Sequence, residues 1–230
     1  MNDDWSPLEP EQHDAQLAAV RTLLPDRARV LDLGAGNGRM ASPLARDGHD
    51  VIAFERDARA IDALSAAPIR AIHADFLDQH AWSALPDPFD AALCLGNTWL
   101  EVTDALDALT LARRVRTRLA PGGFFAIDCF VYETWRDVAE GNWQEGLSED
   151  GSAQLVWGEG DAIIAWRTGD AVDPESWGLG ASDRPVRLWD LGALRLLAHA
   201  AGFSDPEIRA GDHLILLRPA IGAPHPPENS

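Results

Sequence analysis

Lysine is absent from this chain of 230 residues, so arginine supplies all 19 of its fixed positive side chains. The chain also carries 37 aspartate and glutamate residues, which gives a formal net charge of -18. A surface of this sign repels the phosphate backbone of nucleic acids, which argues against a nucleic acid as partner or substrate. Because an acidic surface also keeps a protein soluble, the charge alone does not identify the substrate.

Cysteine is almost as scarce. The two cysteines, Cys94 and Cys129, form no close-spaced pair, which excludes a disulfide framework and a cysteine-rich zinc site. The seven histidines show no close ligand spacing, so we expect no bound metal. Apolar runs of about 18 residues are also missing, and the N-terminus lacks the basic and apolar regions of a signal peptide. We therefore expect a cytoplasmic protein with no membrane partner.

Short apolar runs alternate with helical patterns over the first two thirds of the chain. Buried strands separated by helices are typical of a parallel sheet that is covered on both faces. The expected strands are residues 28–33, 50–54, 69–73, 89–95 and 124–128, and the expected helices are 37–47, 57–66, 102–119 and 191–200. Two further strands, 205–209 and 213–217, should form a closing pair, with Gly202 ending the helix before them.

Residues 129–185 break this alternation. They hold five of the nine tryptophans, and two strand-like runs, 153–158 and 162–168, flank a turn at 159–161. We interpret this segment as a small β-rich insertion over the substrate site of a single domain, residues 1–220. The proline-rich tail, residues 221–230, is expected to be disordered.

A glycine-rich turn follows the first strand and carries the most specific signal. Asp32 ends the strand, and Gly34, Gly36 and Gly38 follow at alternate positions. A dinucleotide-binding turn, G-x-G-x-x-G, would need its third glycine where Arg39 stands. An aspartate at this point would repel a pyrophosphate, but it suits a ligand with ammonium and sulfonium charges. The turn therefore favours S-adenosylmethionine over a nicotinamide dinucleotide.

The sequence resembles the class I S-adenosylmethionine-dependent methyltransferases at five successive motifs. Asp32-Leu-Gly-Ala-Gly-Asn-Gly38 is similar to their first motif, and Glu55 follows at the family spacing. His73-Ala-Asp-Phe76 resembles the third motif, residues 89–97 the fourth, and residues 119–125 the segment before the fifth strand. The resemblance implies a Rossmann-like, doubly wound α/β fold. Its seven-stranded sheet is mostly parallel, with an antiparallel last strand.

The resemblance also implies a cofactor site for S-adenosylmethionine, with S-adenosylhomocysteine as the product. Glu55 would accept the ribose hydroxyls, Asp75 would meet the adenine amino group, and Phe76 would cover the adenine ring. The complete expected set is Asp32, Gly34, Ala35, Gly36, Asn37, Gly38, Glu55, Arg56, Asp75, Phe76, Leu95, Gly96 and Asn97.

Gly96-Asn-Thr-Trp99 resembles the glycine and sarcosine N-methyltransferase-like branch, which acts on small molecules. It departs from the Asp/Asn-Pro-Pro-aromatic motif of enzymes that methylate bases. The resemblance implies that Asn97 positions the reacting groups. The residues expected to contact substrate are Thr98, Trp99, Tyr132 and Trp135.

Methyl transfer from a sulfonium depends mainly on alignment, and only a hydroxyl acceptor demands a general base. Asp128, at the end of the fifth strand, is the first candidate base, with a loop hydrogen bond as its alternative role. Glu101, Tyr132 and Glu133 are further candidates. We therefore expect N- or O-methylation of a small molecule by a monomer or homodimer. The alternatives are methylation of a protein or nucleic acid, and a non-catalytic cofactor-binding regulator.

Overall fold

The computed structural model describes residues 10–65, 68–83, 85–86, 88–128, 143–144, 146–159, 161–209, 211 and 213–222. Tyr132, Glu133 and Trp135, named above as candidate site residues, lie outside these ranges. Most of the proline-rich tail, from residue 223 on, also lies outside them.

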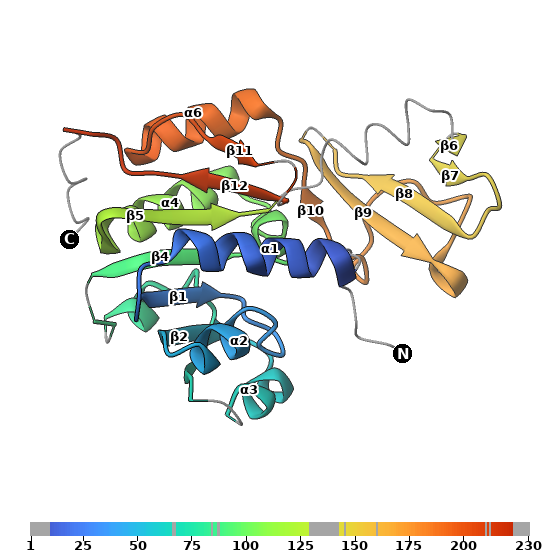
Figure 1. The fold of residues 1–230 in the computed structure, drawn as a ribbon. Helices are drawn as coiled ribbons and strands as arrows, with labels where there is room; N and C mark the ends of the chain where they lie inside the picture. Colours follow the sequence, from blue (N-terminus) through green and yellow to red (C-terminus); the bar gives the residue numbers. More distant parts are fainter. Residues whose placement is uncertain are drawn as a thin grey trace.

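A seven-stranded sheet forms the centre of the molecule, in the order β11-β12-β5-β4-β1-β2-β3 (Figure 1). All neighbouring pairs from β5 to β3 are parallel, whereas β12 is antiparallel to both β5 and β11. The expected doubly wound sheet with an antiparallel last strand is thus confirmed. Its strands are β1 (Arg29–Leu33), β2 (Asp50–Glu55), β3 (Arg70–His73), β4 (Phe89–Cys94), β5 (Leu119–Ile127), β11 (Glu207–Arg209) and β12 (Leu214–Leu217).

The central strands are apolar on both faces because helices cover both. In β1, Val30 belongs to one core cluster and Leu31 to the other, as the alternation of side chains along a strand requires. Val30 lies between Val51 of β2 and Ala91 of β4 in the sheet register. The carboxyl ends of β4, β1 and β2 therefore lie next to one another at one edge of the sheet.

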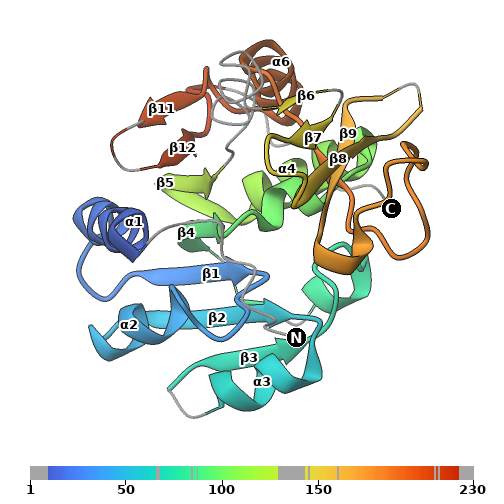
Figure 2. The ribbon, with the colours of Figure 1, turned by 90° about the vertical axis from the view of Figure 1, so that its right-hand side faces the viewer.

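The helices divide between the two faces (Figure 2). α1 (Pro10–Leu23), α2 (Ala41–Arg46) and α3 (Ala58–Leu64) contribute to one core cluster, and α4 (Ala105–Arg118) and α6 (Leu191–Ala201) contribute to the other. α1 was not expected from the sequence. Within the described part of the chain, no helix has the length and apolarity needed to cross a membrane.

Two expected helix starts move toward the C-terminus. α2 begins at residue 41 instead of 37, because the glycine turn continues through Gly38, whose φ is +84°. α4 begins at residue 105 instead of 102, because the Asp104 side chain caps it by accepting from the Leu106 and Asp107 amides. Asp57 caps α3 as expected, accepting from the Arg59 amide at 2.8 Å.

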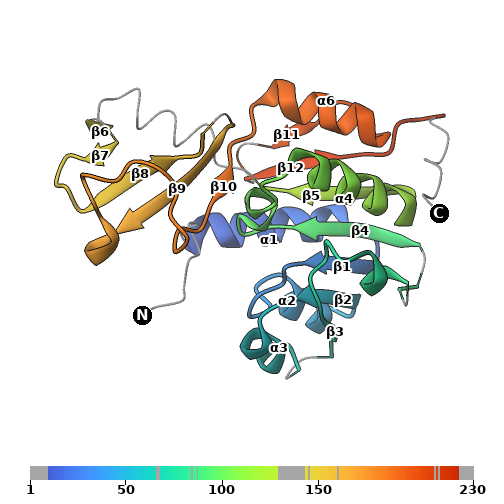
Figure 3. The same ribbon diagram turned by 180° about the vertical axis from the view of Figure 1, so that it is seen from behind.

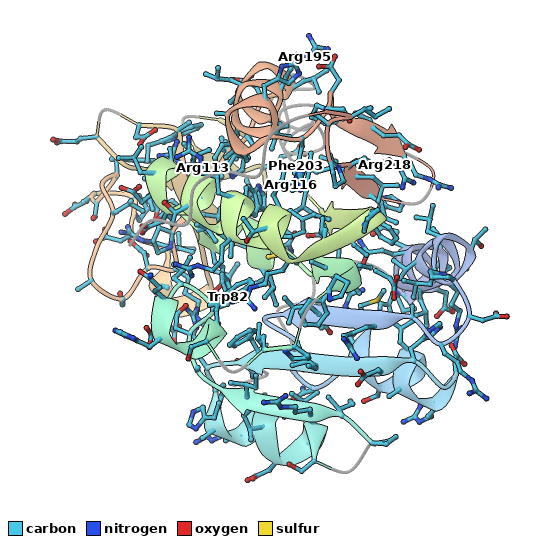
Figure 4. The ribbon with its side chains drawn as sticks, turned by 90° about the vertical axis from the view of Figure 1, so that its left-hand side faces the viewer. Trp82, Arg113, Arg116, Arg195, Phe203 and Arg218 are labelled. Atoms are coloured by element: carbon cyan, nitrogen blue, oxygen red, sulfur yellow. The ribbon has the colours of Figure 1, made fainter. Side chains whose placement is uncertain are left out.

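α4 and α6 are joined by arginines from α4. Arg113 Nε donates to the Ala200 carbonyl and Arg116 Nε to the Gly202 carbonyl, each at 3.2 Å. Figure 4 labels both arginines between the two helices, beside Phe203. The carbonyls at the end of α6 lack partners within the helix, so these bonds satisfy them. Gly202 itself has a φ of +86°, which confirms the expected helix end there.

A second, five-stranded antiparallel sheet, in the order β10-β9-β8-β7-β6, is built from the inserted segment (Figure 3). Its strands are β6 (Trp143–Gln144), β7 (Leu147–Ser148), β8 (Ala153–Trp157), β9 (Ile163–Thr168) and β10 (Val186–Arg187). The β8–β9 pairing confirms the expected hairpin. The inserted segment was expected to end at residue 185, but its sheet continues two residues further, through β10. The small sheet lies beyond the end of the main sheet at which β1 and β5 finish (Figure 1).

Candidate active site

The glycine turn after β1 folds back against the end of β2. The Gly34 and Ala35 amides both donate to the Phe54 carbonyl, at 2.9 and 3.0 Å. A Cβ on Gly34 would lie 2.4 Å from Thr98 Cγ2, and the φ of +73° at Gly34 also disfavours a side chain. At Gly36 the space that a Cβ would enter is open, with no atom within 4 Å. The turn is thus tightly packed at Gly34, whereas the space beside its backbone at Gly36 is open.

Glu55, at the end of β2, holds this turn in place. Its Oε2 accepts from the Gly36 amide at 2.7 Å, and its Oε1 accepts from the Asp57 amide at 2.8 Å. The side chain is 8% exposed and lines the pocket described next. Because a carboxylate offers about four acceptor positions, two remain for the hydroxyls of a ligand.

A pocket of about 1080 Å³ opens at the carboxyl ends of β1, β2, β3 and β4. It brings together all the expected cofactor residues except Asn97. Asp75 and Phe76, after β3, lie at this pocket, and the Asp75 carboxylate accepts from the Leu77 amide at 2.8 Å. The expected residues that line it are Asp32, Gly34, Ala35, Gly36, Asn37, Gly38, Glu55, Arg56, Asp75, Phe76, Leu95 and Gly96.

Asp32 is a buried carboxyl at the base of the pocket. Its Oδ2 has no hydrogen-bond partner among the described residues, and the side chain is 3% exposed. Burial raises the pKa of Asp32 to about 7, against the opposing effects of the Arg39 charge and a hydrogen bond from the Ala41 amide. A cationic ligand beside Asp32 would favour its ionised form.

Asp128 serves as an anchor for the loop after β4. Its Oδ2 accepts from the Gly96 amide at 2.6 Å and from Gln16 Nε2 of α1 at 3.1 Å, while its Oδ1 accepts from the Asn97 amide at 3.0 Å. It is 4% exposed and does not line the pocket. Burial raises the pKa of Asp128, and these hydrogen bonds oppose the rise. This geometry corresponds to the loop hydrogen bond, the alternative role of Asp128, and gives no sign of a base.

Asn97 is held at an unusual backbone conformation by this anchor. Its φ is +66°, which few residues other than glycine adopt, and its side chain is 1% exposed. The following residue, Thr98, lines the pocket, and its Oγ1 donates to the Leu95 carbonyl at 3.0 Å. Asn97 thus acts on the pocket through the backbone that presents Thr98.

The structure corrects the expectation that Trp99 contacts substrate. Trp99 is fully buried and absent from the pocket wall. Its ring packs at 5.8 Å from that of Phe125 and at 5.5 Å from that of Trp189. Trp99 follows Thr98 into η2 (Thr98–Glu101), which turns its side chain into the core. Trp99 is therefore a core residue, although it lies next to a binding loop in the sequence.

Several parts of the pocket wall were not expected from the sequence, among them α2 and Thr103. Two others are α1, through His13 and Leu17, and residues 183–186, which lead into β10 of the small sheet. The signal for α1 was available: Pro10 suits a first helical position, and Leu17, Val20 and Leu24 follow at helical spacing. For residues 183–186 the sequence carried no signal, because a folded-back loop has no periodicity.

Arg56 and Glu101 meet across the pocket. Arg56 Nη2 lies 2.6 Å from Glu101 Oε2, and both residues line the wall. Arg56 follows β2 and Glu101 follows β4, with β1 between these strands, so the pair spans the end of β1. Among the described residues, no group of three or more histidine, cysteine, aspartate or glutamate side chains is arranged to hold a metal ion.

A family model described as a methyltransferase domain matches residues 10–207, most of the chain and every element that forms the pocket. The chain belongs to this methyltransferase family. It is an S-adenosylmethionine-dependent methyltransferase. A search of curated proteins finds no match.

Solved structures share the fold of this methyltransferase at low identity. The CcbJ methyltransferase from Streptomyces caelestis is 20% identical, covers 95% of this chain and 100% of its own, and has a TM-score of 0.67. The sugar N-methyltransferase KedS8 from Streptoalloteichus is 20% identical over 95% of this chain and 89% of its own, with a TM-score of 0.59. The amino pentose methyltransferase CalS10 from Micromonospora echinaspora, solved with S-adenosylmethionine, is 18% identical over 94% and 92%, with a TM-score of 0.58.

The residues of this pocket fit the cofactor. The unpartnered oxygen of Asp32 can take a hydrogen bond from an ammonium group, and the open space at Gly36 lets a ligand approach the backbone. The remaining acceptor positions of Glu55 suit a ribose diol. When bound, S-adenosylmethionine supplies an electrophilic methyl group on a positively charged sulfur.

Proposed function

We propose that this methyltransferase methylates a nitrogen atom of a small-molecule acceptor. The observation that supports this proposal is that the pocket extends from the motif residues to residues 183–186, at the end of the inserted segment and the start of β10. A volume of about 1080 Å³ exceeds what one drug-sized ligand needs, so a cofactor and a small acceptor fit side by side.

The charges on the wall favour a cationic acceptor such as an amine. Six carboxylates and four arginines line the pocket. Arg56 is already paired with Glu101, whereas Asp32 has an unpartnered oxygen. The net negative wall, in a chain of net charge -18, would attract a protonated amine toward the site. KedS8 and CalS10, whose names describe a sugar N-methyltransferase and an amino pentose methyltransferase, support an acceptor of this kind.

The chain's own contribution to the chemistry is alignment. Asp128 and Gln16 hold the Gly96–Asn97 backbone, and this backbone fixes Thr98 at the pocket wall. A nucleophile held in line with the methyl group can gain about 7–11 kcal/mol of barrier reduction from alignment alone. An amine that arrives protonated must first give up its proton to water. The free amine then forms the N–C bond as the S–C bond breaks, and needs no strong base, which agrees with Asp128 being used as a loop anchor.

The test has two arms. Calorimetry should show binding of S-adenosylhomocysteine and none of NAD. Purified protein with S-adenosylmethionine labelled in the methyl group should then be given small amines, amino sugars and phenols, with transfer RNA and casein as macromolecular substrates. We expect label in amino compounds only. Label in transfer RNA or casein would refute the small-molecule proposal, and binding of S-adenosylhomocysteine with no transfer to any class would favour a cofactor-binding regulator.

Narrower expectations stay predictions. The likeness to the glycine and sarcosine N-methyltransferase-like branch rests on residues 96–99, and we propose it on that segment alone. A cytoplasmic location, and a monomeric or homodimeric state, also stay predictions.

A further inference from the structure

α1 presents one face to the active site. His13 and Leu17 line the pocket, and Gln16, on the same face, is fully buried. Residues three and four positions apart lie on one side of a helix, so these three side chains point the same way. Figure 1 shows the N-terminal end of α1, which carries His13, on the side of the molecule where the small sheet lies.

Gln16 fixes the rotation of this helix. Its Nε2 donates to Asp128 Oδ2 at 3.1 Å and to the His213 carbonyl at 3.0 Å, and its Oε1 accepts from Arg39 Nη1 at 2.8 Å. Asp128 in turn holds the Gly96 amide of the loop after β4. Because α1 is tied to this loop, His13 is displaced about 4.5 Å along the helix axis from the anchor, toward the small sheet.

His13 is a pocket residue with an unused polar atom. Its Nε2 is buried and has no hydrogen-bond partner among the residues that the structure describes. Glu55 and Arg56, by contrast, already have partners in the pocket: Glu55 accepts from two amides, and Arg56 pairs with Glu101. A buried nitrogen without a partner is costly unless a ligand supplies one.

The surroundings of His13 favour the neutral form of its imidazole. Burial lowers the pKa of His13, the charge of Arg39 lowers it further, and Asp14 opposes both. A neutral imidazole has one nitrogen that accepts a hydrogen bond. Asp32, the other pocket residue with a buried unpartnered atom in the described part of the chain, is instead suited to a positive charge.

We propose that His13 contacts the methyl acceptor, and that its Nε2 accepts a hydrogen bond from an N–H group of the nitrogen that is to be methylated. This inference rests on the proposed function, because it takes the acceptor to occupy this pocket. The contact would orient the nucleophile and discriminate against acceptors without a hydrogen to donate.

Two cofactor analogues test the contact without knowledge of the acceptor. S-Adenosylhomocysteine lacks the methyl group, whereas sinefungin carries an amine in its place and so presents N–H groups where transfer occurs. Calorimetry should measure both dissociation constants for the wild type and for His13→Leu, with His80→Leu, an exposed histidine outside the pocket, as the matched control. We expect His13→Leu to raise the dissociation constant of sinefungin at least about tenfold more than that of S-adenosylhomocysteine.

Further variants separate a contact from a loss of folding. His13→Gln keeps an acceptor oxygen and should lose less sinefungin affinity than His13→Leu. If His13→Leu does not fold, His13→Phe takes its place in the experiment, because phenylalanine keeps a ring but has no nitrogen. If the affinities for both analogues fall equally, or if neither changes, the role of His13 is overturned while the cofactor site stands. Failure of the wild type to bind S-adenosylhomocysteine would instead overturn the proposed function.

Discussion

The buried carboxyl of Asp32 leads to a quantitative prediction about stability and pH. Its pKa is raised from the ordinary value of 3.8 to about 7 in the folded protein, first by burial, with Arg39 and the Ala41 amide opposing. At any pH between 3.8 and about 7, the folded protein therefore binds more protons than the unfolded chain does. Folding stability therefore falls as the pH rises through this window, and Asp32→Asn removes that fall.

The size of the effect follows from the shift. At about 1.4 kcal/mol for each pH unit, a rise from 3.8 to about 7 corresponds to at most about 4 kcal/mol. For a protein of this length, 1 kcal/mol changes the melting temperature by about 2–4 °C. Between pH 4 and pH 8, the melting temperature of the wild type should therefore drop by about 10 °C more than that of Asp32→Asn.

Differential scanning calorimetry of the cofactor-free protein, at constant ionic strength, measures this difference. Asp26→Asn, a change at an exposed aspartate, serves as the control and should follow the wild type. The same Asp32→Asn protein should bind S-adenosylmethionine less tightly at pH 8, because the ionised carboxylate would attract the positive charge of the cofactor. Parallel melting curves for wild type and Asp32→Asn across the pH range would refute the reasoning.

Three further predictions concern the turn, the ribose site and the inserted segment. Glu55→Gln should raise the dissociation constant of S-adenosylhomocysteine at least about tenfold in calorimetry, because an amide has one acceptor oxygen instead of two. Gly34→Ala should destabilise the fold by about 2–4 kcal/mol in urea unfolding, since the new methyl group meets Thr98 and the backbone stays strained. Arg167→Ala should cost about 3 kcal/mol, because it leaves the buried carboxylate of Asp183 without its partner at 2.7 Å.

Matched variants complete these experiments. Glu159→Gln, at an exposed position, should leave the affinity for S-adenosylhomocysteine unchanged. Gly122→Ala carries the same backbone strain with open space around its Cβ, so it should cost about 1 kcal/mol and no more. Removing both partners, in Arg167→Met with Asp183→Leu, should cost less than Arg167→Ala alone. A loss in Gly122→Ala as large as in Gly34→Ala would contradict the steric argument.

The main sheet could be predicted from the sequence because its signals are local. A buried parallel strand such as β2 holds a continuous apolar run, residues 51–54, and a turn such as 34–38 needs glycine at fixed positions. The ends of α2 and α4 could not be placed as well. The glycine turn decides where α2 starts, and the Asp104 cap decides where α4 starts. In both places the neighbouring residues also fit a helical pattern, so the sequence pattern alone does not show the first residue of the helix.

The cofactor side of the site was predictable for the same reason, and the acceptor side was not. Glu55 and Asp75 follow strands at spacings that the sequence displays. The role of Asp128 depends on Gln16, a residue 112 positions away, and no local pattern records that pairing. Trp99 and Thr98 are adjacent in sequence yet face the core and the pocket, because a tight 3-10 turn separates their directions.

The contacts of Gln16 also bear on how the enzyme becomes active as it is made. One side-chain nitrogen of Gln16 bonds Asp128 and the His213 carbonyl, which lies 197 residues further along the chain. The helix that carries His13 is synthesised first, but its docking partners emerge only with β5 and β12. Contacts this distant in sequence form slowly and late. A nascent chain can therefore build its cofactor turn early, and it completes the opposite wall of the pocket only when its first helix meets its last strand.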